Sequence, residues 1–303
     1  MKTSKLIERI TGPSSKAWSV GDRAFELMDQ GKDIIHLGIG DPDFDTPSQV
    51  VAAIGIALDN GKTHYSPLAG ETELRKQIAV HANTLYGDGI ESEHIAVLPG
   101  AQAALFSIFL CISGADDEVI ILEPTYATYP AVIQANGAKL VTIVLESEND
   151  YQINLPKIKA AVTKNTKAIL INSPCNPSGV IFKQQDLNTL AKFCQEHSIW
   201  LVCDEVYWSL TFDQEHCSAY LQRETRDNVI VINSLSKSHA MSGWRVGWVI
   251  APPAIIEALT SLSQAQYFGV NQFVQLAAIH ALKDHQSPKE FQEIFRARRD
   301  AFL

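Results

Sequence analysis

From about residue 94 onward, short apolar stretches rich in β-branched residues alternate with stretches of helical period. Strands separated by helices of this length are typical of an α/β fold with a largely parallel sheet. Ligands of such sheets bind at the carboxyl ends of the strands, so we expect functional residues there. The predicted buried strands are His94–Leu98, Glu118–Leu122, Lys139–Val144, Lys167–Asn172, Trp200–Asp204, Val229–Asn233 and Gly247–Ile250.

Helices are predicted between most of these strands and after the last one. Before about residue 48 we expect a first helix and a connection rich in Gly, Pro and Asp. After residue 252 the pattern predicts helices to the end of the sequence. The predicted helices from residue 94 on are Ala101–Ile112, Thr125–Asn136, Leu155–Val162, Gln184–His197, Pro253–Gln266, Asn271–Lys283 and a last one from Pro288 to Leu303.

Composition excludes several classes of partner. The formal net charge of −9 argues against a surface that binds nucleic acid or an anionic membrane. The charges at the N-terminus are not followed by the apolar core of a secretory signal, and no apolar run is long enough to span a bilayer. The cysteines are scattered and odd in number, as in reduced thiols: Cys111, Cys175, Cys194, Cys203 and Cys217. We therefore expect a cytoplasmic protein.

The segment Asn233–Trp248 contains a lysine with hydroxyl and guanidinium groups near it. Ser234 and Ser236 precede Lys237, and Arg245 follows it. An amine that forms a Schiff base beside a bound phosphate requires such a set, because the lysine supplies the covalent link and the other groups hold phosphate oxygens. The alternative is a solvated loop of basic residues, and other parts of the chain decide between the two.

Two glycine-containing segments have some features of an anion-binding site. The segment Leu98–Ala104 joins a predicted strand to a predicted helix. The first amides of that helix have no hydrogen-bond partner, and Gly100 lets an anion approach them closely, so the segment predicts an anion cradle. An ordinary glycine turn is the alternative. Gly38–Asp43 resembles the start of a dinucleotide-binding fingerprint. It lacks the third glycine and the following helix, and we reject that interpretation.

Polar and aromatic residues follow other predicted strands. The rigid turn Asn172–Gly179 can present the amide of Asn176 to a ligand oxygen, although it is equally a structural turn. Asp204 ends a buried strand and requires a partner, because an unpaired buried charge is very costly. Glu205 is expected to be a solvent-facing or supporting group. Tyr126 is expected to present its ring at the carboxyl edge of the sheet, or else to pack in the core.

Taken together, these residues meet the requirements of pyridoxal phosphate. The cofactor needs a lysine for covalent attachment and a site for its phosphate. A carboxylate must keep its ring nitrogen protonated, so that the ring acts as an electron sink. Its phenolic oxygen needs hydrogen-bond donors, and its flat ring needs a stacking partner.

With these motifs the chain resembles fold-type I pyridoxal-phosphate enzymes of the class I/II aminotransferase family, from about residue 5 to the last residue. The resemblance implies an α/β fold with a mostly parallel, mixed seven-stranded sheet flanked by helices, plus an incomplete small domain. It divides the chain into an N-terminal arm and small-domain segment (1–47), a large cofactor-binding domain (48–285) and the start of a C-terminal small domain (286–303).

The resemblance also implies roles for individual residues. Lys237 would form the Schiff base and move the proton, and Asp204 would pair with the pyridinium nitrogen. Asn176 and Tyr207 would hold the phenolic oxygen, and Tyr126 would stack on the ring. The residues implied for the phosphate are Gly100, Ala101, Gln102, Ser234, Ser236 and Arg245.

Substrate and subunit contacts follow from the same resemblance. Gly38 and Asn176 would contact the substrate, and no metal site is predicted. Tyr65 would reach the cofactor phosphate of a partner subunit and take part in catalysis, which implies a homodimer with shared active sites. Family members continue past the equivalent of Leu303 and carry there the arginine that clamps the substrate carboxylate. We expect Arg296, Arg298 and Arg299 to be surface charges, and the chain to be a fragment or a natural truncation.

The predicted function is a pyridoxal-phosphate-dependent aminotransferase that moves an amino group from an L-amino acid to a 2-oxo acid by a ping-pong Schiff-base mechanism. Within the family, the chain resembles arginine–pyruvate transaminases through the segments Gly40–Pro47, Asn172–Gly179, Asp204–Tyr207 and Asn233–Trp248. No arginine occurs near Gln264–Asn271, where dicarboxylate-specific members keep one, which disfavours aspartate as donor. The alternatives are a pyridoxal-phosphate-dependent C–S β-lyase and a truncated chain that binds the cofactor without turnover.

Overall fold

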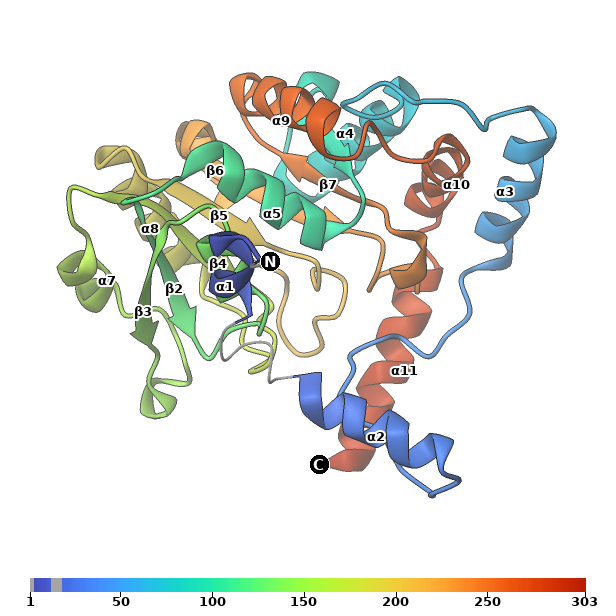
Figure 1. Ribbon diagram of the computed structural model, residues 1–303, viewed down its shortest axis with the longest axis horizontal. Helices are drawn as coiled ribbons and strands as arrows, with labels where there is room; N and C mark the ends of the chain where they lie inside the picture. Colours follow the sequence, from blue (N-terminus) through green and yellow to red (C-terminus); the bar gives the residue numbers. More distant parts are fainter. Residues whose placement is uncertain (1–2, 12–17) are drawn as a thin grey trace.

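The computed structural model describes residues 3–11 and 18–303, so parts of the predicted N-terminal segment, residues 1–2 and 12–17, lie outside the described residues. The fold is built on a seven-stranded sheet with the order β1-β7-β6-β5-β4-β2-β3, in which β7 alone runs antiparallel to its neighbours (Figure 1). The mixed, mostly parallel sheet predicted from the sequence is confirmed. Its strands are β1 (Ile95–Leu98), β2 (Glu118–Glu123), β3 (Lys139–Val144), β4 (Thr166–Asn172), β5 (Trp200–Asp204), β6 (Val229–Ser234) and β7 (Gly247–Ile250).

Helices cover both faces of the sheet. Successive side chains of a strand point to opposite faces, so β2 places Ile120 and Leu122 in one apolar cluster and Val119 and Ile121 in the other. The first cluster is closed by α4 (Thr72–Tyr86), α8 (Gln184–Glu196) and α10 (Gln272–Lys283). The second is closed by α5 (Ala101–Ile112), α6 (Tyr129–Gln134) and α9 (Pro253–Gln266). This burial on both faces explains why the strands are continuous apolar runs.

The remaining helices lie at the periphery. Helix α3 (Ser48–Asp59) packs beside α10 (Figure 1). The others are α1 (Lys5–Ile10), α2 (Ser19–Asp29), α7 (Leu155–Ala161) and α11 (Ser287–Phe302), with short 3₁₀ helices η2 (Ser92–His94), η3 (Ser147–Asn149), η4 (Ala219–Leu221), η5 (Arg223–Asn228) and η6 (Ser242–Trp244). Over the described ranges, no helix is both long and apolar enough to cross a lipid bilayer.

One predicted helix is shorter than its pattern indicated. We expected a helix over Thr125–Asn136, but α6 covers only Tyr129–Gln134. Pro130 lies in its first turn, where a missing N–H costs nothing and the fixed φ favours a helix start. The four residues before it, 125–128, are left outside the helix, and Thr125, Tyr126 and Ala127 line a cavity at the edge of the sheet.

Candidate active site

A cavity of about 1460 Å³ opens at the carboxyl ends of β4, β5 and β6. These strands are parallel, so their last residues Asn172, Asp204 and Ser234 reach the same edge of the sheet, and all three line the cavity. Every site residue predicted from the sequence lines this cavity except Gly100 and Tyr65. The fold therefore gathers residues that are more than 200 positions apart in the chain, such as Gly38 and Arg245, around one space.

Lys237 is half-buried in this cavity, three residues after the end of β6. Its Nζ donates a hydrogen bond of 2.5 Å to the carbonyl oxygen of Gly40 and lies 5.9 Å from the centre of the Tyr207 ring. Burial lowers the pKa of the Lys237 amine, and the nearby Arg245 lowers it further, against the opposing effect of Asp41 and Asp204. A lysine with a lowered pKa has a larger neutral fraction, which is the form that attacks a carbonyl.

Asp204 is the buried carboxylate at the end of β5, with 4% of its surface exposed. Its Oδ2 accepts a hydrogen bond of 2.8 Å from the hydroxyl of Tyr129, and its Oδ1 accepts one of 3.2 Å from the backbone N–H of Val206. Burial raises the pKa of Asp204 to about 6 from its ordinary value of 3.8, although both hydrogen bonds lower it. A cation bound beside this carboxylate would relieve the cost of its burial.

This raised pKa predicts how the stability of the cofactor-free protein depends on pH. The folded state binds the Asp204 proton more tightly than the unfolded state does, so this group's contribution to stability is present at low pH and is lost as pH rises from about 4 to about 6. Urea unfolding measures the free energy of unfolding of wild type and of Asp204→Asn at each pH. Between about pH 4 and pH 7, the value for wild type should fall by about 2–3 kcal/mol more than the value for Asp204→Asn. Parallel pH profiles for the two proteins would contradict the raised pKa.

A chain of hydrogen bonds connects β4, β5 and the turn after β4. Asn172 donates from Nδ2 to the backbone carbonyl of Asp204 (2.9 Å), and its Oδ1 accepts from the backbone N–H of Asn176 (2.7 Å). The side chain of Asn176 then donates to the hydroxyl of Tyr207 (3.3 Å). Burial raises the pKa of Tyr207 to about 12, so this hydroxyl keeps its proton near neutral pH. The Asn176 and Tyr207 side chains are thus held as neighbouring neutral hydrogen-bonding groups.

The start of α5 packs tightly against Arg245. Gly100 has φ +87°, and a Cβ atom there would lie 2.4 Å from Nη2 of Arg245. A Cβ on Gly247 would come within 2.8 Å of the backbone N of Ala101. Both glycines are therefore needed for this approach. The first amides of α5, which have no carbonyl partner one turn back, are brought beside a guanidinium, and together they form a cradle for an anion.

The other predicted residues differ in their position. Tyr126 is half-buried, with its ring edge-to-face against Tyr129 at 5.7 Å. Ser234 is buried and its Oγ accepts from the backbone N–H of Ser236 (3.3 Å). Tyr65 is 80% exposed and contacts Phe268 rather than the cavity.

Sequence reasoning missed several residues. Tyr129, the partner of Asp204, lies three residues after Tyr126, and no local pattern distinguishes it from a core tyrosine. Of the two positions expected for Glu205, the solvent-facing one is wrong, because Glu205 is 2% exposed; a supporting role stays a prediction. Arg299 was expected to be a surface charge, whereas it lines the cavity with Phe295 and pairs with Asp213 and Asp300. The pairing of Asp213 with Arg299 depends on how α11 packs, which its sequence does not reveal.

Comparison with protein families gives a match over residues 32–303 to the model described as "Aminotransferase class I and II". An arginine–pyruvate transaminase of Pseudomonas aeruginosa is 40% identical over 304 aligned positions, which cover 100% of this chain and 77% of that protein. An aspartate aminotransferase of Bacillus subtilis is 36% identical, and the alignment covers 98% of this chain and 76% of that protein.

Solved structures of aminotransferases have the same fold as this chain. An aspartate aminotransferase from Thermus thermophilus, solved with maleate, superposes with a TM-score of 0.93 at 33% identity. The superposition covers 99% of this chain and 78% of that one.

Proposed function

The chain belongs to the class I and II aminotransferase family of pyridoxal-phosphate-dependent transaminases, and we propose that it transfers the amino group of L-arginine to pyruvate in the cavity around Lys237. The observation that carries this choice of substrates is the 40% identity, over the whole chain, to an enzyme named for that reaction. The chemistry of the cavity supports the cofactor and, separately, the donor.

The residues of the cavity fit pyridoxal phosphate. The cradle at the start of α5 offers amides and the Arg245 guanidinium to a phosphate, and Gly100, which has no Cβ, lets the guanidinium lie against it. Buried Asp204, with its raised pKa, would be stabilised by a cationic ring nitrogen. Asn176 and Tyr207 offer an amide and a hydroxyl to a phenolic oxygen, Tyr126 offers an aromatic face, and Lys237 offers an amine.

When bound, pyridoxal phosphate supplies an aldehyde that exchanges amines and a ring that accepts electron density from the substrate Cα. We propose that Lys237 Nζ attaches the cofactor and then takes and returns the Cα proton. The Asp204 carboxylate keeps a proton on the ring nitrogen, and the Tyr129 hydroxyl holds that carboxylate in place. Gly38, which lines the cavity, and Asn176 are the proposed contacts for the substrate carboxylate.

Arg245 provides a test of the phosphate site that does not depend on turnover. Arg245→Gln should weaken the binding of pyridoxal phosphate about 10- to 150-fold, since a charge-assisted hydrogen bond contributes about 1.5–3 kcal/mol. The same change should leave the weaker binding of pyridoxal, which has no phosphate, within about twofold. Absorbance titrations of both proteins with both compounds measure the difference. Equal losses for the two compounds would place the phosphate elsewhere.

The charges that line the cavity outside the proposed cofactor site support a cationic donor. Arg299 is already paired with Asp213 and Asp300, so it has less charge to offer a substrate carboxylate. Asp41 and Asp150 also line the cavity and can attract a guanidinium. Aspartate is the second candidate donor, because an aspartate aminotransferase is 36% identical over nearly the whole chain and Lys183 lies in the cavity lining.

The choice of donor can be tested with a small panel of amino acids. The loaded enzyme is mixed with arginine, alanine or aspartate in turn, and loss of the cofactor's visible absorbance and formation of the 2-oxo acid are followed. We expect arginine to give the highest kcat/KM and alanine, the amino form of pyruvate, to react as well. A preference for aspartate would overturn the proposed donor and leave the transaminase assignment in place.

We also propose a homodimer and a cytoplasmic location. Support for the dimer comes from Tyr65, which is 80% exposed beside Phe268 and so is free to reach a second copy of the chain. Support for the location comes from the cysteines, all five of which are free thiols. Sedimentation equilibrium of wild type and of Tyr65→Ala, together with cofactor affinity, tests whether this residue acts across a subunit boundary.

A further inference from the structure

Glu205 is a buried carboxylate that lies outside the cavity. Its backbone N–H donates to the carbonyl of Ile232 (2.9 Å), so Glu205 continues the pairing of β5 with β6 for one residue. Because side chains alternate along a strand, its carboxylate points away from that of Asp204, into the opposite face of the sheet. With 2% of its surface exposed, the carboxylate requires hydrogen-bond donors from the protein.

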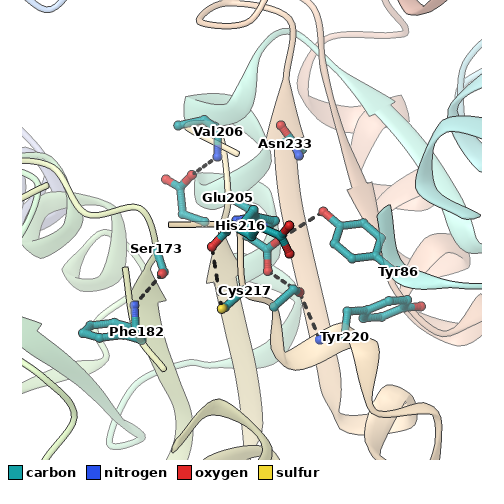
Figure 2. Close-up of polar contacts among 12 residues, drawn as sticks. Tyr86, Ser173, Phe182, Glu205, Val206, His216, Cys217, Tyr220 and Asn233 are labelled. Carbon is teal, nitrogen blue, oxygen red and sulfur yellow. Dashed lines mark hydrogen bonds and ion pairs between the residues drawn. The ribbon is translucent and has the colours of Figure 1, made fainter. Parts of the chain in front are cut away.

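Three side chains supply these donors, and Figure 2 labels two of them, Tyr86 and His216. Tyr86, at the end of α4, donates from its hydroxyl to Oε2 at 2.9 Å. His216 approaches the same oxygen with Nε2 at 2.8 Å, and Ser218 donates from Oγ to Oε1 at 2.6 Å. Two of the donors, His216 and Ser218, belong to the loop between β5 and η4. The carboxylate therefore fixes this loop to the sheet and, through Tyr86, to α4.

The same loop forms one wall of the cavity. The residues of the loop that line it are Val206, Tyr207, Leu210, Thr211, Phe212, Asp213 and Gln214. Helix α11 also holds this wall. Arg299 pairs with Asp213, and its guanidinium lies 4.9 Å from the centre of the Phe212 ring. Gln292 and Arg296 donate to the backbone carbonyls of Thr211 and Phe212. The Arg299–Asp213 pair is partly exposed, and exposed ion pairs contribute little. The loop is therefore attached at two places, by α11 at residues 211–213 and by the buried Glu205 cluster at residues 216 and 218.

We propose that Glu205 is a positioning residue that, through His216 and Ser218, holds the 210–214 wall of the substrate cavity and so sets the affinity for the amino acid. Glu205 touches neither the cavity nor the proposed cofactor groups, so its role is exerted through the loop. The inference rests on the proposed function for its substrate, but the anchoring of the loop can be measured without turnover.

The asymmetry of the His216 ring shows that Glu205 is its main contact. To donate from Nε2 to a carboxylate, a neutral His216 must leave Nδ1 as an acceptor. Nδ1 is buried and has no hydrogen-bond partner in the described part of the chain. The ring therefore makes one good hydrogen bond in the described structure. Removing that bond should loosen the loop on the cavity side of residue 216, while Ser218 stays bonded to Glu205 and Gln184.

The test compares four changes in the holoenzyme. His216→Phe keeps a planar ring but loses the donor, and His216→Gln keeps a donor near the position of Nε2. Glu205→Gln neutralises the buried carboxylate, and Glu215→Gln neutralises an exposed carboxylate in the same loop. Steady-state kinetics with pyruvate as acceptor use whichever of arginine and aspartate wild type accepts better. Hydrogen exchange measures the amides of residues 210–218.

We expect His216→Phe to raise KM for the amino acid about tenfold with kcat within about twofold, and to speed exchange of the loop amides about tenfold while β5 and β6 stay protected. His216→Gln should recover most of both effects, and Glu215→Gln should match wild type. Glu205→Gln, which leaves one oxygen for its donors, should resemble His216→Phe.

Other outcomes decide against the proposal. Unchanged loop exchange in a folded His216→Phe would show that the carboxylate does not anchor the wall. If His216→Phe or Glu205→Gln lowered kcat with KM unchanged, the cluster would act on the reacting groups through Asp204. If wild type accepted none of the amino acids, the proposed function would fail, and the exchange measurement would still decide the anchor. Should Glu205→Gln not fold, the two His216 variants carry the test.

Discussion

Replacing Lys237 with alanine is expected to abolish covalent attachment of the cofactor and to lower the rate of amino transfer by about 10⁴-fold or more. Proton transfer by a positioned side chain alone contributes about 10²–10⁴-fold, and this substitution also removes the nucleophile. Non-covalent binding should persist, because the proposed phosphate and ring contacts come from other residues, including Arg245 and Asp204. Borohydride reduction followed by mass spectrometry measures the attachment, and formation of the 2-oxo acid measures the rate.

Lys183→Ala is the matched control, because Lys183 lines the same cavity but lies far from Lys237 in the chain. That variant should keep the covalent attachment. If Lys237→Ala retained attachment, or turned over within about tenfold of wild type, another amine would be the nucleophile and the site would have to be redrawn.

Asp204→Asn should produce the second largest loss. An amide has no negative charge to hold a proton on the ring nitrogen, and a neutral ring accepts carbanion density poorly. Loss of one preorganised electrostatic contact to developing charge costs about 3–4 kcal/mol, which is about 10²–10³-fold in rate. Single-turnover kinetics of the loaded enzyme with an amino acid isolate this step from cofactor binding.

Two further variants show whether the loss of rate in Asp204→Asn is specific to this carboxylate. Tyr129→Phe removes only the hydrogen bond to Oδ2 of Asp204 and should cost about tenfold, since such bonds contribute about 1–1.5 kcal/mol. Asp227→Asn removes an exposed carboxylate in η5 and should not change the rate. A single-turnover rate for Asp204→Asn equal to that of wild type would mean that Asp204 is not the partner of the ring.

The strands other than the edge strand β3 could be predicted from the sequence because each is buried on both faces. A strand such as β4 or β6 is a continuous run of β-branched and apolar residues, which has few other ways to bury itself. The length of α6 was harder to predict, because the apolar spacing extends over residues 125–136 whereas Pro130 and the cavity decide where the helix begins. Packing of α3 beside α10 joins segments more than 200 residues apart, and no local pattern encodes it.

The site shows the same division between local and distant information. Lys237, Ser234, Ser236 and Arg245 lie within one short segment, so their chemistry could be inferred together. The hydrogen-bond partners that other helices and loops supply could not be inferred from this segment. The Tyr129 hydroxyl reaches Asp204 across 75 residues, and the Tyr86 hydroxyl reaches Glu205 across 119. Glu205 follows Asp204 directly, but its burial follows from the position of α4 and of the 216–218 loop.

Transfer of a labelled amino group tests the central claim most directly. The wild-type chain, loaded with pyridoxal phosphate, is incubated with pyruvate and L-arginine that carries ¹⁵N at its α-amino group, and the products are analysed by mass spectrometry. The proposed function predicts ¹⁵N-alanine and the 2-oxo acid of arginine in equal amounts, and neither product with Lys237→Ala. Recovery of the label as ammonium, or entirely as unreacted arginine while the cofactor is bound, would contradict transfer from arginine to pyruvate at this site.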